Sequence, residues 1–107
     1  MEQDDLWLNV AHAFSKFSED PVRKVGAVLV RDGKLICYDW NRALPSAPIK
    51  NWDDRALVNA KIQHAEIGAL SHFDCRGGIL YVTKQPCESC EKVIKAKGVR
   101  VVWKEIR

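Results

Sequence analysis

Apolar residues recur along the chain at spacings typical of helices and strands. Between residues 5 and 18 they form one stripe of an amphipathic helix, at Leu6, Val10, Ala13, Phe14 and Phe17. The uninterrupted apolar run at residues 25–30 predicts a strand that is buried on both faces. Asp32-Gly33 follows as a strong hairpin signal, so we expect residues 35–40 to return antiparallel beside that strand.

The second half of the chain alternates helices and strands. A helical pattern covers residues 55–71, after a long polar segment at residues 41–54 that we expect to be an ordered loop. The remaining elements are a strand at 79–83, a helix at 87–97 and a strand at 99–103. This order predicts a three-layer α/β/α domain with a mixed sheet, one hairpin and two crossovers between parallel strands.

Composition sets limits on the class of protein. The 107 residues predict one domain (1–107), and a hydrophobic content of 47% is ordinary for a globular protein. No apolar run approaches the roughly 20 residues that cross a bilayer. The acidic first five residues lack the positive region of a secretory signal, so we expect a cytoplasmic protein with no membrane partner. A net charge of +3 is too small to indicate a nucleic-acid partner.

Two short motifs carry the candidate chemistry, namely His64-Ala65-Glu66 and Pro86-Cys87-Glu88-Ser89-Cys90. In a reducing compartment a C-x-x-C motif indicates metal or redox chemistry. One imidazole and two thiolates would hold Zn²⁺ and leave its fourth position open, as in a catalytic zinc site. Cys87 and Cys90 lie in the first turn of the predicted helix at 87–97. Unpaired backbone N–H groups and the helix dipole at that end stabilise thiolates.

The two functional groups of the first motif must face one metal. Residues two apart, such as His64 and Glu66, point about 200° apart around a helix and do not share a face. We therefore expect the helix to begin only at about His64, with the preceding residues in the long connection. Zinc lowers the pKa of bound water toward 7, and Glu66 would then act as the proton shuttle.

These motifs, in this order, are the signature of zinc nucleobase deaminases, and the sequence resembles the cytidine deaminase superfamily over nearly its whole length. Free-nucleoside cytidine deaminases generally have cysteine as first ligand, so His64 points to other branches. The long insert before His64, which includes Asp54-Arg55 and Lys61, is similar to the deoxycytidylate deaminases. By resemblance, Asn41 would contact the sugar, and the remaining substrate contacts would be Gly26, Ala27, Val28 and Ala65.

The resemblance implies a zinc hydrolase that converts dCMP, or a 5-substituted relative, to the uracil nucleotide and ammonia. It also implies a nucleotide substrate, a Zn²⁺ cofactor and a homo-oligomer. The sequence departs from the family at Gly68, where asparagine is typical, and it is expected to be short at its C-terminal end. The candidates for phosphate recognition are Arg23, Lys24, Arg42, Arg55 and Lys61.

Two other functions remain open. Trp40-Asn41-Arg42 is more similar to the tRNA adenosine deaminases, and deamination of a base in tRNA or single-stranded nucleic acid would require a basic and aromatic groove beside the zinc. A non-catalytic, zinc-stabilised binding module would require a fourth protein ligand, for which Cys75 and His72 are the candidates.

Overall fold

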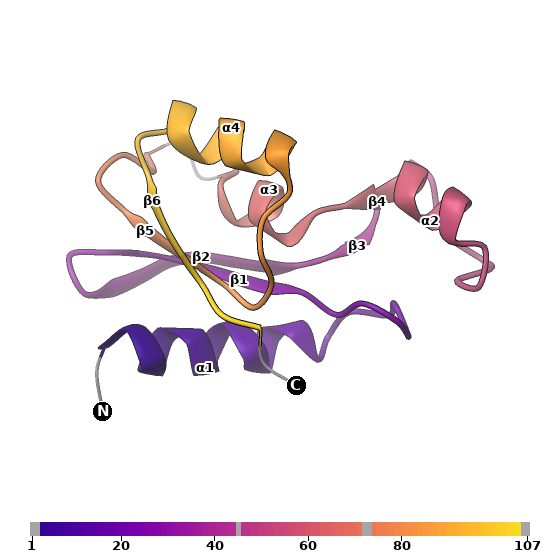
Figure 1. Ribbon diagram of the computed structural model, residues 1–107, viewed down its shortest axis with the longest axis horizontal. Coiled ribbons are helices and arrows are strands. Elements are labelled where there is room, and N and C mark those ends of the chain that lie inside the picture. The colour runs from indigo at the N-terminus through magenta and orange to yellow at the C-terminus, as the bar shows by residue number, and fades with distance from the viewer. Residues whose placement is uncertain (1–2, 45, 72–73, 106–107) are drawn as a thin grey trace.

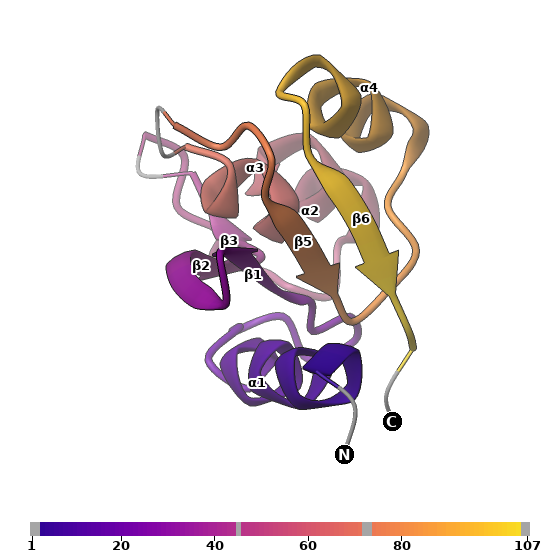
Figure 2. The ribbon, with the colours of Figure 1, turned by 90° about the vertical axis from the view of Figure 1, so that its left-hand side faces the viewer.

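A central sheet lies between helices on both of its faces (Figures 1 and 2). The computed structural model describes residues 3–44, 46–71 and 74–105. Their elements are α1 (Gln3–Ser15), β1 (Gly26–Arg31), β2 (Lys34–Trp40), β3 (Arg42–Ala43), α2 (Arg55–Lys61), β4 (Ile62–Gln63), α3 (Ala65–Ala69), β5 (Ile79–Val82), α4 (Glu88–Ala96) and β6 (Arg100–Trp103). Helix α1 covers one face of the sheet, and α3 and α4 cover the other, which confirms the predicted α/β/α layers.

The sheet has the strand order β2-β1-β5-β6. Strand β1 is antiparallel to both β2 and β5, and β5 is parallel to β6. Strands β2 and β5 therefore run in the same direction, so both predicted crossovers do join parallel strands. The predicted hairpin is also confirmed: Asp32 and Gly33 have φ of 54° and 73°, the left-handed pair that a two-residue turn requires.

The face that α1 turns toward the sheet differs from the predicted stripe. Its buried residues are Leu8, Ala11 and Ser15, whereas Leu6 and Phe17 are exposed. The reason is a close approach of backbones, because a Cβ added to Gly26 of β1 would lie 1.9 Å from the carbonyl oxygen of Ala11. The small residues Ala11 and Ser15 permit this contact. Because Ser15 is polar, it falls outside the predicted apolar stripe.

The segment predicted as one late-starting helix contains two helices and a short strand between them. Helix α2 is capped by Asp54, whose side chain accepts a 3.2 Å hydrogen bond from the N–H of Leu57. The chain then extends through β4, which pairs with β3 inside the segment predicted as a loop. Helix α3 begins at Ala65 with His64 as its N-cap, so the predicted start is confirmed and the loop assignment of residues 55–61 is wrong.

The core has one cluster on each face of the sheet. The larger cluster joins Ala27 and Leu29 of β1 to α3 and α4, and the smaller joins Val28 and Val30 of β1 to α1. Alternate residues of β1 thus face opposite layers, as expected for a strand covered on both sides. Within the described part of the chain, no helix is long and apolar enough to cross a membrane.

Candidate active site

The three predicted metal ligands meet where α3 and α4 begin. His64 is the N-cap of α3, and Cys87 is the N-cap of α4. The Nδ1 atom of His64 lies 3.8 Å from the Sγ of Cys87 and 3.5 Å from the Sγ of Cys90. The ligand atoms of all three residues lie within 4.8 Å of one another. This spacing suits one ion held between them.

The thiols also have the chemistry that a zinc ion requires. Burial alone would raise the pKa of Cys87, but hydrogen bonds from Ser89 and from the backbone of Cys90 outweigh it and hold that pKa below its ordinary value. Burial raises the pKa of Cys90, and the nearby carboxylate of Glu66 raises it further. A buried thiol beside a carboxylate ionises only if a cation compensates it, so the donor set fits Zn²⁺.

Of the two candidates for a fourth ligand, Cys75 does not join the group. Among the described residues, His64, Cys87 and Cys90 are the members of this ligand group. Cys75 is buried in the core, where its Sγ lies 3.5 Å from the carbonyl oxygen of Leu70. His72 lies outside the described residues. Within the part of the chain that the structure describes, three ligands leave one zinc position open, as in a catalytic rather than a structural zinc site.

Glu66 lines the same cleft as His64 and Cys87, on the first turn of α3. Its side chain is only 5% exposed. Burial raises the pKa of Glu66, although the charges of His64 and Arg23 oppose the shift. Burial thus favours the protonated form of this carboxyl group, and a carboxyl group beside the ligands is suited to act as general acid and base.

The cleft has two walls that belong to different parts of the chain. We call one wall the lining residues Arg23 and Val25, which precede β1, together with Asn41, and the other wall Asn59 of α2 and Ile62 of β4. Val25, Asn59 and Ile62 were not predicted. Asn59 and Ile62 could not be placed from the sequence, because α2 and β4 were themselves not predicted.

Asn41 lines the cleft but also fixes its wall. Its Oδ1 accepts a 2.9 Å hydrogen bond from the N–H of Val25, and its Nδ2 donates a 2.7 Å hydrogen bond to the carbonyl oxygen of Arg23. The side chain is 5% exposed. Asn41 therefore orders the segment before β1, and its predicted contact with a sugar stays a prediction.

The other predicted substrate contacts are dispersed. Gly26 packs against α1, and Val28 belongs to the core cluster on the same side of the sheet, away from the metal ligands. Ala27 and Ala65 are fully buried on the ligand side, in the core cluster beneath α3 and α4. The structure thus brings Asn41 to Glu66 and the ligands but does not bring Gly26 or Val28 there.

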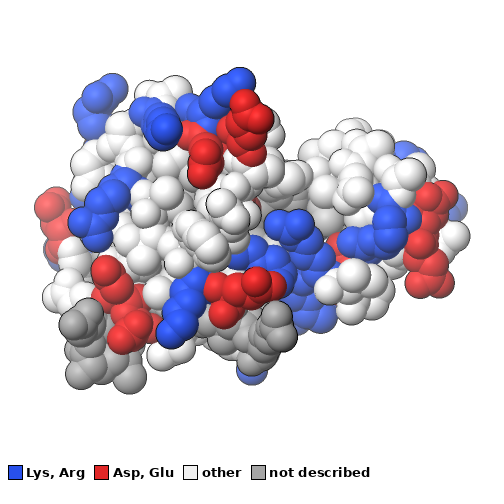
Figure 3. Space-filling model, in the orientation of Figure 1, with Lys and Arg blue, Asp and Glu red and all other residues white. Residues whose placement is uncertain are grey.

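The structure gives the predicted phosphate ligands different surroundings. Arg23 lines the cleft with Glu66. Arg55 is paired with Asp20, Arg42 with Asp39, and the ammonium group of Lys24 donates to the carbonyl oxygen of Ser18. Figure 3 shows Lys and Arg side chains gathered at the hollow between the layered body and the α2 lobe.

Comparison with known proteins assigns the chain to a family whose chemistry agrees with this site. The family model described as the cytidine and deoxycytidylate deaminase zinc-binding region matches residues 1–105. The chain belongs to this family. It is a zinc-dependent hydrolytic deaminase, and its resemblance to the deoxycytidylate branch is confirmed by the relatives that follow.

Three similar proteins indicate the range of relatives. Deoxycytidylate deaminase of Mycobacterium phage D29 is 32% identical over 118 residues, which cover 94% of this chain and 92% of that protein. The tRNA-specific adenosine deaminase of Bacillus subtilis is 28% identical over 105 residues, covering 95% and 61%.

The third is dCMP deaminase from cyanophage S-TIM5. Its apo structure matches with a TM-score of 0.79 and 30% identity, covering 96% of this chain and 84% of that one. Its complex with dCMP and dUMP matches with a TM-score of 0.72 and 26% identity, covering 96% and 82%.

Proposed function

We propose that this deaminase converts dCMP, or a 5-substituted dCMP, and water into the corresponding deoxyuridine monophosphate and ammonia. The observation that carries the chemistry is the buried carboxyl group of Glu66 in one cleft with His64 and Cys87, two members of the ligand group that Cys90 completes. Similarity over nearly the full length of a phage deoxycytidylate deaminase supports the mononucleotide substrate. An intracellular homo-oligomer is part of the proposal, as the family resemblance implies.

The residues of the cleft would have separate roles in this reaction. When bound by His64, Cys87 and Cys90, zinc supplies a Lewis acid that makes hydroxide available at neutral pH. Glu66 accepts the two protons of the attacking water one after the other, and it passes one to the ring nitrogen and the other to the departing amino group. The water oxygen becomes the carbonyl oxygen at C4 of the base, and the amino group leaves as ammonia.

Arg23 is the group that we propose to bind the 5′-phosphate. Among the described cationic side chains it is the one that lines the cleft. An arginine offers a planar fork of donors that matches a phosphate group.

A second candidate is deamination of a base within single-stranded nucleic acid. Such an enzyme needs aromatic faces beside the cleft, and a groove there is lined by Phe17, Trp40, Arg42 and Trp52. The Arg42 guanidinium lies 5.0 Å from the centre of the Trp40 ring. Because Asp39 already pairs with Arg42, the groove has little free positive charge for a phosphate backbone, and we place this candidate second.

Ammonia release from the zinc-loaded protein separates these functions. The substrates are dCMP, dCTP, deoxycytidine and a short RNA hairpin, and we expect dCMP to give the highest kcat/KM. Glu66→Gln should keep its zinc and lose at least about 100-fold in kcat, because it removes the proton shuttle. The matched control is Glu88→Gln, which changes an exposed carboxylate on the first turn of α4. Activity on the hairpin alone would contradict the mononucleotide proposal, and an active Glu66→Gln would contradict the mechanism.

A further inference from the structure

A partly buried ion pair links the two segments that carry the walls of the cleft. The guanidinium of Arg55 donates two hydrogen bonds of 2.9 Å to the two carboxylate oxygens of Asp20. The Asp20 side chain is 1% exposed, whereas the Arg55 side chain is 34% exposed. The two residues lie 35 positions apart in the chain. Such a bidentate ion pair fixes the orientation of the two side chains as well as the distance between them.

The carboxylate of Asp20 holds one wall directly. It accepts hydrogen bonds from the N–H of Val22, at 2.9 Å, and from the N–H of Arg23, at 3.2 Å. Arg23 is also held from the other side, through the bond from Asn41 to its carbonyl oxygen. The backbone that presents the Arg23 side chain to the cleft is therefore fixed at both its N–H and its carbonyl.

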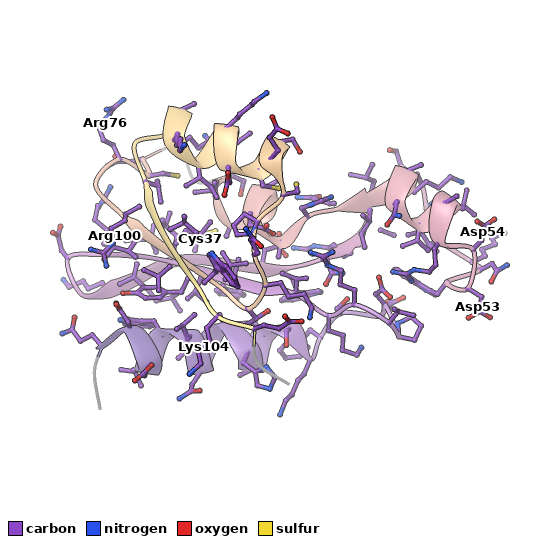
Figure 4. The ribbon with its side chains drawn as sticks, in the orientation of Figure 1. Cys37, Asp53, Asp54, Arg76, Arg100 and Lys104 are labelled. Carbon is purple, nitrogen blue, oxygen red and sulfur yellow. The ribbon has the colours of Figure 1, made fainter. Side chains whose placement is uncertain are left out.

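Arg55 anchors the opposite wall. It is the first residue of α2, whose Asn59 lines the cleft. Helix α2 lies apart from the three layers, and Asp53 and Asp54 at its start form the far tip of the molecule (Figures 1 and 4). Arg55 also donates a 3.1 Å hydrogen bond to the carbonyl oxygen of Trp52, which ties the turn before α2 to the same pair.

We propose that Asp20 and Arg55 are positioning residues that set the width of the cleft, by holding α2 with Asn59 against the segment that carries Arg23. This inference rests on the proposed function only in that it assigns Arg23 to the substrate. Neither residue lines the cleft, and the guanidinium of Arg55 donates to Asp20 and to the carbonyl oxygen of Trp52. The pair therefore acts on substrate binding and leaves the metal ligands and Glu66 in place.

The test uses the full zinc-loaded chain with Arg55→Lys and Asp20→Asn. Lysine keeps the charge but loses the two-pronged contact, and asparagine keeps an acceptor oxygen for the N–H groups of Val22 and Arg23. The matched control is Arg31→Lys, because Arg31 makes an ion pair of 3.0 Å with Asp74 at the end of β1. The measurements are kcat, KM, zinc per chain and amide exchange at Val22 and Arg23.

Both variants should raise KM about tenfold with kcat within about twofold, because misplaced walls weaken binding without changing the chemical step. In both variants zinc content should stay at the wild-type value, and amide exchange at Val22 and Arg23 should become faster. The control Arg31→Lys should change neither KM nor amide exchange at these two residues. Unchanged KM or unchanged exchange would overturn the proposal. So would loss of folding in both variants, because the pair would then support the fold as a whole.

The two proposals fail separately. KM is measured with whichever substrate the wild type deaminates fastest, so a preference for another substrate removes only the dCMP assignment. If the wild type releases ammonia from none of them, the proposed function fails, and amide exchange alone decides whether the pair orders the segment of Arg23.

Discussion

The Nδ1 atom of His64 lies 3.5 Å from the Sγ of Cys90, although 26 residues separate them in the chain. Strand β5 lies between them in the sequence and in the middle of the sheet, flanked by β1 and β6. The starts of α3 and α4 therefore meet on one side of the sheet, and the folded backbone brings the metal ligands together.

Removing one of these ligands should remove the metal. Cys90→Ser is expected to lose most of its zinc, because a neutral hydroxyl replaces a thiolate among three ligands. Elemental analysis should show far less than one zinc per chain, and ammonia release should fall to background. Cys37→Ser is the control, since Cys37 lies outside the ligand group. Full zinc occupancy in Cys90→Ser would show that the metal is held elsewhere.

Gly68, where the family resemblance predicts asparagine, packs directly against Asp39. A Cβ added there would lie 1.6 Å from the Oδ2 of Asp39, whose side chain is buried and accepts hydrogen bonds from Arg42 and from the N–H of Trp40. The carboxylate of Asp39 thus occupies the space into which any larger side chain at position 68 would extend.

Gly68→Ala should accordingly destabilise the protein by about 1–3 kcal/mol, the usual cost of an overpacked core. Urea unfolding measures the change in the free energy of unfolding. In the double variant with Asp39→Ala the cost of Gly68→Ala should be smaller, because most of the clash is removed. Strictly additive effects of the two changes would contradict the contact.

Tyr81 should titrate abnormally late. Its hydroxyl donates a 2.6 Å hydrogen bond to the Oδ1 of Asp4, and burial together with that bond raises the pKa of Tyr81 to about 12. The chain has two tyrosines, so in Tyr38→Phe the phenolate absorbance reports Tyr81 alone. Its midpoint should lie near 12, against about 10 for a free tyrosine, and Asp4→Asn should lower it.

The same shift affects stability at high pH. Between about pH 10 and about pH 12 Tyr81 keeps its proton in the folded state and releases it in the unfolded state. The free energy of unfolding therefore falls as the pH rises through this range. Tyr81→Phe should reduce this fall relative to Tyr38→Phe, when both are measured by guanidinium unfolding. Equal pH dependence in the two variants would contradict the raised pKa.

The chemistry was easier to predict from the sequence than the shape of the cleft. His64, Glu66, Cys87 and Cys90 were predicted because metal chemistry restricts both residue type and spacing. The start of α3 followed from the need of His64 and Glu66 to face one ion, and the structure has it there.

The missed features share a physical cause, which is that they depend on contacts between distant segments. Strands β3 and β4 have two residues each, too few for an alternating pattern. Burial of Ser15 follows from the close approach of α1 to Gly26, which no apolar stripe reveals. The pairing of Asp20 with Arg55 is likewise set by tertiary structure alone.

Arg23 provides the most direct test of the substrate. If its guanidinium binds the 5′-phosphate, Arg23→Ala should raise KM for dCMP about 10- to 100-fold. This factor corresponds to the loss of a hydrogen bond to a charged group, which contributes about 1.5–3 kcal/mol. For deoxycytidine, which has no phosphate, KM and kcat should barely change. Arg100→Ala is the control, because Arg100 is an exposed arginine on β6 that does not line the cleft. An equal loss with both substrates would assign Arg23 to the base or to Glu66 instead, and the phosphate assignment would then be wrong.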